Sequence, residues 1–173
     1  MAVRDIVKLP DPILKTVSAP VPAVTDEVRG LVRDMLDTMY AAPGIGLAAV
    51  QIGIPKRIVV IDVARDDEPK APKCFINPEI VWRSEETAEY EEGCLSIPEF
   101  YDKIVRPAEV QVRYMDVDGE EMSIDCSGLL ATCIQHEIDH VNGVLFIDHL
   151  TRLKRDRIVK KFIKAAKLDK EEA

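Results

Sequence analysis

The feature that most constrains this chain is the segment 135–143, which reads Gln-His-Glu-Ile-Asp-His-Val-Asn-Gly and contains an H-E-x-x-H motif. On a helix, His136 and His140 lie one turn apart on one face, so both imidazoles can reach a single metal ion. Glu137 lies about 100° around the helix from His136, where a carboxylate can take a proton from a water on the metal. Because the chain has only three histidines, this pairing favours a metal site over two ordinary histidines.

Composition narrows the class of protein. The length of 173 residues suits one domain, and the hydrophobic fraction of 47% and charged fraction of 31% are typical of globular proteins. The net charge of −8 argues against sequence-specific nucleic-acid binding and against an anionic membrane surface. No apolar run approaches the ~20 residues of a membrane span, and no signal-peptide core is evident. We therefore expect a cytoplasmic protein whose four cysteines are thiols or metal ligands.

Local signals mark an N-terminal arm and two helices. Four prolines predict an extended arm over residues 1–22. Thr25, followed by two acids, predicts the start of an outer helix, and Pro43 ends it. Ser127 and Gly143 predict the ends of the motif helix, whose apolar residues on two sides indicate a central, buried position.

Strand signals lie between these helices. β-branched and aromatic runs predict strands over 57–63 and 75–82, and Pro78 favours an edge strand or a bulge. The acidic stretch 85–92 is typical of a solvated segment. Alternating residues on both sides of an Asp-Gly turn predict a hairpin over 110–126. The predicted fold is α+β: antiparallel strands around a central metal-binding helix, with an outer N-terminal helix and a C-terminal helix.

A catalytic metal site needs a third protein ligand and one open position. The third histidine of metzincins would fall at Phe146, and no glutamate follows the motif until the extreme C-terminus. The Cα of Cys133 would lie about 7–8 Å along the helix axis from the midpoint of the two histidines, too far for a short thiol. His149 lies beyond the helix end and is better interpreted as a surface or structural histidine. Cys94 remains, but the residues alone leave the third ligand open.

Three segments together resemble the peptide deformylase family. They are G-x-G-L-A-A-x-Q at 44–51, E-G-C-L-S at 92–96 and Q-H-E-x-D-H at 135–140. All three are complete and in the family's order, and the whole chain (1–173) resembles a single catalytic domain of the bacterial form with a C-terminal helix. The resemblance implies one divalent metal ion on Cys94, His136 and His140. It implies Fe(II) in the cell, with Zn, Ni or Co able to replace it on these ligands.

The resemblance also implies an activity, because the family removes the formyl group from N-formylmethionine at the start of nascent polypeptides. In that chemistry a metal hydroxide attacks the formyl carbon, with Glu137 as general base and then general acid. The side-chain amide of Gln51 and the backbone N–H of Leu95 would stabilise the oxyanion.

Five further residues are candidates for binding the substrate. Ile45, Gly46 and Gly93 match family positions whose backbones pair with the extended substrate, a form of strand addition. Leu129 and Cys133, one helical turn apart beside the motif, can wall an apolar pocket for the methionine side chain, which Ile45 would close.

Two positions concern the surroundings of the site. Several bacterial relatives carry an Arg seven residues after the ligand cysteine, where this chain has Tyr101, so the rim of the substrate groove departs from the family pattern. Arg106 matches a family Arg that pairs with the acid at Asp139, and we expect a buried pair that orients the motif helix.

The C-terminal segment is basic in an acidic protein. We expect a helix over 151–168, with fraying beyond it. From 151 to 170, two acids are set against nine basic residues, Arg152, Lys154, Arg155, Arg157, Lys160, Lys161, Lys164, Lys167 and Lys170. Most such charge runs are solvated faces. The family's substrate emerges from the ribosome, however, so we expect this helix to hold the enzyme near the phosphate-rich exit tunnel.

Two rival functions fit parts of the pattern. A zinc metalloprotease shares the H-E-x-x-H motif but uses a downstream Glu or His ligand that this chain lacks. A structural zinc module would need four protein ligands, and the sequence offers no evident fourth.

Overall fold

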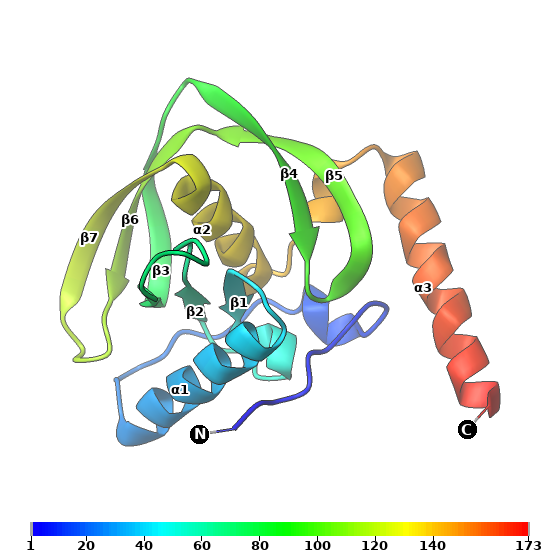
Figure 1. The fold of residues 1–173 in the computed structure, drawn as a ribbon, viewed down its shortest axis with the longest axis horizontal. Helices are drawn as coiled ribbons and strands as arrows, with labels where there is room; N and C mark the ends of the chain where they lie inside the picture. Colours follow the sequence, from blue (N-terminus) through cyan, green and yellow to red (C-terminus); the bar gives the residue numbers. More distant parts are fainter. Residues whose placement is uncertain (1, 173) are drawn as a thin grey trace.

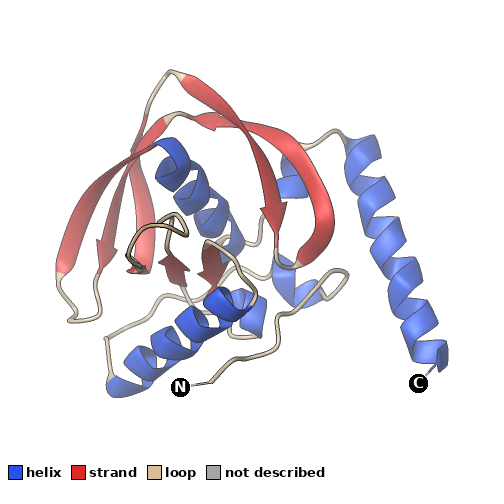
Figure 2. Cartoon of the chain, viewed as in Figure 1, coloured by secondary structure: helices blue, strands red, loops and turns tan. Residues whose placement is uncertain are grey.

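A five-stranded antiparallel sheet forms one wall of the molecule. The computed structural model describes residues 2–172, with side chains described as far as residue 170. The strands of this sheet lie in the order β1-β2-β3-β6-β7, and Figure 2 shows them in red. Their bounds are β1 Gly46–Ala48, β2 Ile58–Ile61, β3 Lys73–Arg83, β6 Glu109–Met115 and β7 Glu121–Ser127.

The strands predicted over 57–63, 75–82 and 110–126 are present in this sheet. β3 pairs with β2 on one side and β6 on the other, and its register shifts between Ile76 and Glu79, on either side of Pro78. Of the two alternatives for that proline, the bulge is therefore correct, because β3 is not an edge strand. β6 and β7 pair across a turn whose Gly119 has a φ of +81°, a conformation that costs glycine little.

A second sheet is a two-stranded ribbon that arches over the centre of the molecule. It consists of β4 (Thr87–Cys94) and β5 (Ile97–Pro107), and Figure 1 shows it curving above α2. Most of the segment 85–92 is exposed, as predicted, although it forms the greater part of β4. Glu89 and Glu91 are exposed, whereas Glu92 is buried, since its charge is paired with Arg106 inside the ribbon.

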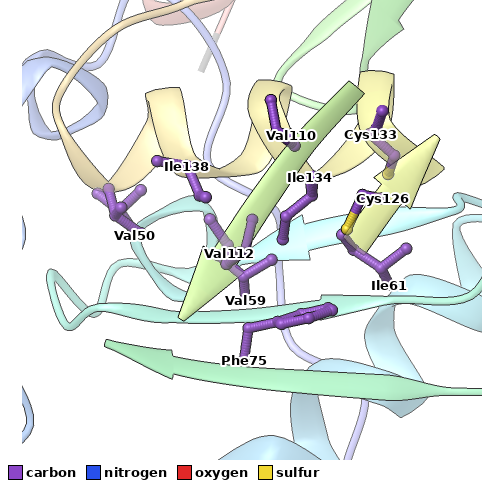
Figure 3. Packing of buried hydrophobic residues seen from close by; sticks show 13 residues of the cluster. Val50, Val59, Ile61, Phe75, Val110, Val112, Cys126, Cys133, Ile134 and Ile138 are labelled. Atoms are coloured by element: carbon purple, nitrogen blue, oxygen red, sulfur yellow. The ribbon is translucent and has the colours of Figure 1, made fainter. Parts of the chain in front are cut away.

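The motif helix α2 (Gly128–Val141) lies at the centre, as predicted. Its Ile134 and Ile138 pack with Val59, Ile61 and Phe75 of the large sheet in one buried cluster, which Figure 3 shows from close by. Helix α2 ends at Val141, and Gly143 adopts the αL conformation with a φ of +75°. A Cβ there would lie 2.5 Å from the carbonyl oxygen of Lys15, so only glycine fits this close approach.

Helix α1 (Asp26–Ala41) covers the opposite face of the large sheet, as Figure 1 shows. Thr25 caps it as predicted, accepting a hydrogen bond from the backbone N–H of Val28. On β2, Ile58 and Val60 pack with α1 whereas Val59 and Ile61 pack with α2. Alternation along the strand therefore buries both faces of β2 between the two helices, and the predicted α+β architecture is confirmed.

Helix α3 (Arg152–Glu172) lies at the outer side of β5 (Figure 1). It continues past the predicted end at 168, to Glu172, and the fraying expected there stays a prediction. Its Phe162 ring lies 5.5 Å from that of Phe100, and Lys154 pairs with Asp102 at 3.3 Å. Among the helices of residues 2–172, none is long and apolar enough to cross a membrane.

The N-terminal arm is tied to the segments around the motif residues. The backbone N–H of Val7 donates to the carbonyl of Gln51 at 2.7 Å, and that of Leu9 donates to Ser96 at 3.0 Å. The arm is not wholly extended, because a short 3-10 helix occupies Pro12–Lys15. These bonds bring the arm beside the 3-10 helix Ala49–Ile52, which follows β1, and beside the turn between β4 and β5.

Candidate metal centre

Three side chains converge where the end of β4 meets α2. The Sγ of Cys94 lies 3.3 Å from Nε2 of His140, whose Nε2 lies 3.2 Å from Nε2 of His136. All three donor atoms lie within 4.8 Å of one another. A tetrahedral ion bound at ~2.0–2.3 Å would hold its ligands ~3.3–3.8 Å apart, so the cluster fits a metal ion. The structure thus brings together the three residues predicted as ligands.

The other cysteines lie away from this cluster. All four belong to the described part of the chain and are free thiols. The thiol of Cys133 lies in the cleft wall, 3.9 Å from the carbonyl oxygen of Ile45, and is not part of the donor cluster. Burial raises the pKa of Cys133 well above its usual value, so this thiol stays protonated. That position agrees with the axial-distance argument from the sequence.

Glu137 lies beside the donor cluster rather than within it. Its Oε1 is 3.8 Å from Nε2 of His140 and 4.0 Å from Nε2 of His136. The residue is 2% exposed, and this burial raises the pKa of its carboxyl to about 7. A group with a pKa near neutrality can both accept and return a proton under physiological conditions.

A buried carboxylate that the sequence analysis missed orients the first histidine. Glu92 accepts a hydrogen bond from Nδ1 of His136 at 2.9 Å, which leaves Nε2 free to face the metal position. It also accepts two bonds from the guanidinium of Arg106, at 2.7 and 2.9 Å. Although burial opposes its charge, the bonds from His136 and Arg106 lower the pKa of Glu92 to about 2. One signal in the sequence could have pointed to Glu92. It opens the E-G-C-L-S segment, directly before Gly93 and Cys94.

The same arginine holds the outer face of α2. Arg106 donates to Oδ2 of Asp139 at 2.9 Å, so the expected pair is present, with the arginine buried and the aspartate partly exposed. His149 lies 2.8 Å from the same oxygen and is not part of the donor cluster, as expected of a structural histidine.

The two imidazoles differ in their affinity for protons. Burial alone would lower the pKa of His136, but hydrogen bonds with Cys94 and Glu92 raise that pKa well above its usual value. Burial and the neighbouring His136 lower the pKa of His140 well below its usual value. Because a metal requires free imidazole lone pairs and a thiolate, its binding would displace protons from this cluster.

A cleft of about 1000 Å³ opens onto these groups. All five residues predicted to bind substrate line it, namely Ile45, Gly46, Gly93, Leu129 and Cys133. A Cβ on Gly46 would lie 2.9 Å from the sulfur of Cys133 and 3.0 Å from a carboxylate oxygen of Glu137. The absence of a side chain at Gly46 therefore lets the backbone of β1 run directly beside the reactive groups.

The predicted oxyanion donors also line the cleft. Gln51 is buried, and its Oε1 accepts from the backbone N–H of Ala48 at 2.9 Å. This bond turns Nε2 toward Ser96 Oγ at 3.0 Å and Cys94 Sγ at 3.6 Å. The amide nitrogen is thus held next to the donor cluster, and Leu95 follows Cys94 at the same wall.

Comparison with known proteins agrees with this geometry. The polypeptide deformylase family profile matches residues 3–156. A peptide deformylase of Phenylobacterium zucineum is 60% identical over 96% of this chain and 99% of its own length. One of Methylocella silvestris is 62% identical over 99% of this chain and 89% of its own length.

Solved structures give the same result. A peptide deformylase from Ehrlichia chaffeensis superposes with a TM-score of 0.91 at 44% identity, over 97% of this chain and 99% of that one. A structure of the enzyme from the same organism in complex with actinonin gives a TM-score of 0.90 at 46% identity, over 95% and 98%. The chain therefore belongs to the polypeptide deformylase family, as its three sequence segments predicted.

Proposed function

We propose that this enzyme removes the formyl group from formylmethionine at the start of nascent polypeptides, by metal-assisted hydrolysis of the formyl amide. The observation that carries the proposal is the placement of Glu137 beside the donor cluster of Cys94, His136 and His140, at the base of a cleft. The direct test is turnover of formyl-Met-Ala under anaerobic conditions, with metal analysis of the same sample.

A divalent ion on these three donors would supply Lewis acidity and lower the pKa of a water toward neutrality. Glu137 takes a proton from the attacking water and returns it to the departing amine nitrogen. As the carbon is attacked, the Gln51 amide and the Leu95 backbone N–H donate to the formyl oxygen, on which negative charge develops. We propose Fe(II) as the ion in the cell, with Zn, Ni or Co as replacements, because a mixed thiolate and imidazole set suits all four.

The cleft would bind the substrate as an added strand. The backbones of Ile45, Gly46 and Gly93 pair with the peptide, which fits any sequence, while one side-chain pocket selects the first residue. Leu129 and Cys133 form the apolar wall for the methionine side chain. Residues 1–173 would then form a single catalytic domain.

The rival functions have less support. A metalloprotease would need a downstream Glu or His ligand, which this sequence lacks. The relatives named above are peptide deformylases. A structural zinc site uses four protein ligands, whereas the donor cluster found within residues 2–172 has three.

We further propose that α3 docks this cytoplasmic enzyme on the ribosome near the exit tunnel. Five basic side chains of α3 are exposed, Arg157, Lys160, Lys161, Lys164 and Lys167, and they form a stripe suited to phosphate. Phe162 packs on β5, and Lys161, at the edge of the stripe, has its Nζ 5.2 Å from the centre of the Phe100 ring, so the helix can anchor on the domain with this side and present the other basic residues.

Changing Cys94 to Ser should alter metal content or metal-centred spectra, because oxygen replaces one of three donors. Changing Cys133 to Ser should retain one metal ion per chain, because its thiol only lines the cleft. Metal analysis after gel filtration measures both. Undiminished metal content and activity in Cys94→Ala would refute the ligand assignment.

Changing Glu137 to Gln should preserve metal binding and lower kcat by roughly 100-fold or more, the usual scale for a general acid–base group. Glutamine keeps the shape of the side chain but cannot accept the proton. Steady-state kinetics on formyl-Met-Ala, with metal content measured in parallel, tests this. A variant that turns over at the wild-type rate would show that the reaction needs no such carboxylate.

Formyl-Met peptides should be preferred over formyl-Ala peptides by at least about tenfold in kcat/KM, because an apolar pocket gains ~1–3 kcal/mol per methylene. Leu129→Ala should reduce this preference while leaving the metal content unchanged. Equal rates on both peptides in the wild-type enzyme would mean that Leu129, Cys133 and Ile45 do not form the pocket.

Replacing Lys160, Lys161 and Lys164 together by Gln should keep activity on a free formyl dipeptide and abolish co-sedimentation with ribosomes. In the wild type, that binding should weaken steeply with salt, as phosphate contacts release counterions. A matched control replaces the exposed Lys70, Lys73 and Lys103 by Gln, which removes the same charge elsewhere. If the α3 variant binds ribosomes like this control, the stripe is only a solvated face.

A further inference from the structure

One wall of the cleft is a short segment that joins α1 to β1. Six consecutive residues, 41–46, line the cleft, and they include Ile45 and Gly46, whose backbones are proposed to pair with the substrate. Residues 42–45 belong neither to the helix nor to the strand. The position of this wall segment therefore depends on what holds its two ends.

A single residue behind the wall segment contacts both of its ends. Asp62, which directly follows β2, donates its backbone N–H to the carbonyl oxygen of Ile45 at 2.8 Å, and this bond extends the pairing of β1 with β2 by one residue. Oδ2 of Asp62 accepts a hydrogen bond at 2.6 Å from the hydroxyl of Tyr40, in the last turn of α1. Asp62 therefore ties the end of the helix to the start of the strand.

Local bonds hold only the first half of the wall segment. The backbone N–H groups of Ala42 and Gly44 donate to carbonyl oxygens near the end of α1, at 3.1 and 2.8 Å. The carbonyl of Ile45 bonds Asp62 instead, so the position of the substrate-pairing half relative to α1 depends on the bond between Asp62 and the helix.

The carboxylate of Asp62 is itself fixed in place. The residue is 6% exposed, and its oxygens also accept hydrogen bonds from the backbone N–H groups of Ala64 and Ala71, both at 3.0 Å. Burial alone would raise the pKa of Asp62, but the hydrogen bonds from the Tyr40 hydroxyl and these two N–H groups lower it. Three donors converging on one buried carboxylate leave it a single orientation.

The ring of Tyr40 is also held in place. Nζ of Lys70 lies 4.2 Å from the ring centre, within the range of a cation–π contact. Elsewhere the ring packs against the apolar cluster that α1 forms with β2. Because Lys70 directly precedes Ala71, the loop between β2 and β3 brings the ammonium to the ring and a backbone N–H to Asp62. These contacts direct the Tyr40 hydroxyl toward the carboxylate.

Neither Tyr40 nor Asp62 lines the cleft. Both can act on a bound peptide only through the backbone of Ile45. A peptide that adds to a strand is bound by backbone groups at a fixed spacing, so a shift of Ile45 would misalign the pairing.

We propose that Tyr40 and Asp62 are positioning residues, whose side-chain hydrogen bond holds the backbone of Ile45 where it pairs with the substrate. This inference rests on the proposed deformylase function and adds to it two residues that the substrate does not touch. Backbone pairing stabilises the bound substrate and the transition state equally, so weakening it should raise KM and leave kcat nearly unchanged. The expected rise is about fivefold, the scale of one hydrogen bond.

The test is Tyr40→Phe, which removes the hydroxyl and keeps the ring. Its KM for formyl-Met-Ala-Ser and its Kd for the product Met-Ala-Ser, measured by calorimetry, should both rise about fivefold, with kcat and metal content unchanged. Tyr114→Phe is the matched control, because it removes the hydroxyl of another partly buried tyrosine, which packs on Phe75 outside the cleft. It should behave like the wild type.

A second measurement follows the bond to Ile45 directly and needs no activity. In Tyr40→Phe, hydrogen exchange at the backbone amide of Asp62, followed by NMR, should accelerate about fivefold, because local opening becomes easier when the anchor to α1 is lost. In Tyr114→Phe this amide should exchange at the wild-type rate.

An unchanged KM in Tyr40→Phe would overturn the proposal, because the hydrogen bond would then serve only the fold. Equal rises in KM in Tyr40→Phe and Tyr114→Phe would overturn it as well. If the metal-loaded wild type turns over no formylated peptide, the proposed function itself fails. The exchange rate at Asp62 then still shows whether Tyr40 holds the wall segment, so the two failures are distinguishable.

Discussion

The structure depends on the buried carboxylate of Glu92, which joins the β4–β5 ribbon to the central helix. It accepts hydrogen bonds from Arg106 of β5 and from His136 of α2, while Arg106 also holds Asp139 of α2. Buried charges persist only where every lone pair and proton finds a partner, and loss of one partner typically costs ~3–5 kcal/mol. This network therefore fixes the distance between ribbon and helix, and with it the distance between Cys94 and the two histidines.

The same junction creates the chemical environment of Glu137. Ribbon, helix and β1 close around it, and the glycine at position 46 lets the β1 backbone approach its carboxylate. The resulting burial raises the pKa of Glu137 to about 7, whereas the hydrogen bonds that the less deeply buried Glu92 accepts from His136 and Arg106 lower its pKa to about 2. Two carboxylates on neighbouring elements thus have pKa values shifted in opposite directions, low for Glu92, which stays charged beside His136, and near neutrality for Glu137.

The ribbon also links the cleft to the outside of the molecule. Phe100 and Asp102 contact α3 from one face of β5 while Tyr101 lies at the cleft from the other. The helix proposed to face the ribosome therefore packs on the strand that carries the cleft rim. One strand serves both because its side chains alternate between two faces.

The sequence by itself determined the features that depend on local spacing. The i and i+4 histidines, the side position of Glu137 and the glycine end of α2 all follow from backbone geometry within a few residues. Only the tertiary structure decided the rest. The burial of Glu92 among exposed acids was not apparent, because the arginine that pairs with it lies fourteen residues away on another strand. Cys94 reaches the histidines, and Tyr101 reaches the cleft, because the ribbon folds over α2, and no local pattern encodes that long-range packing.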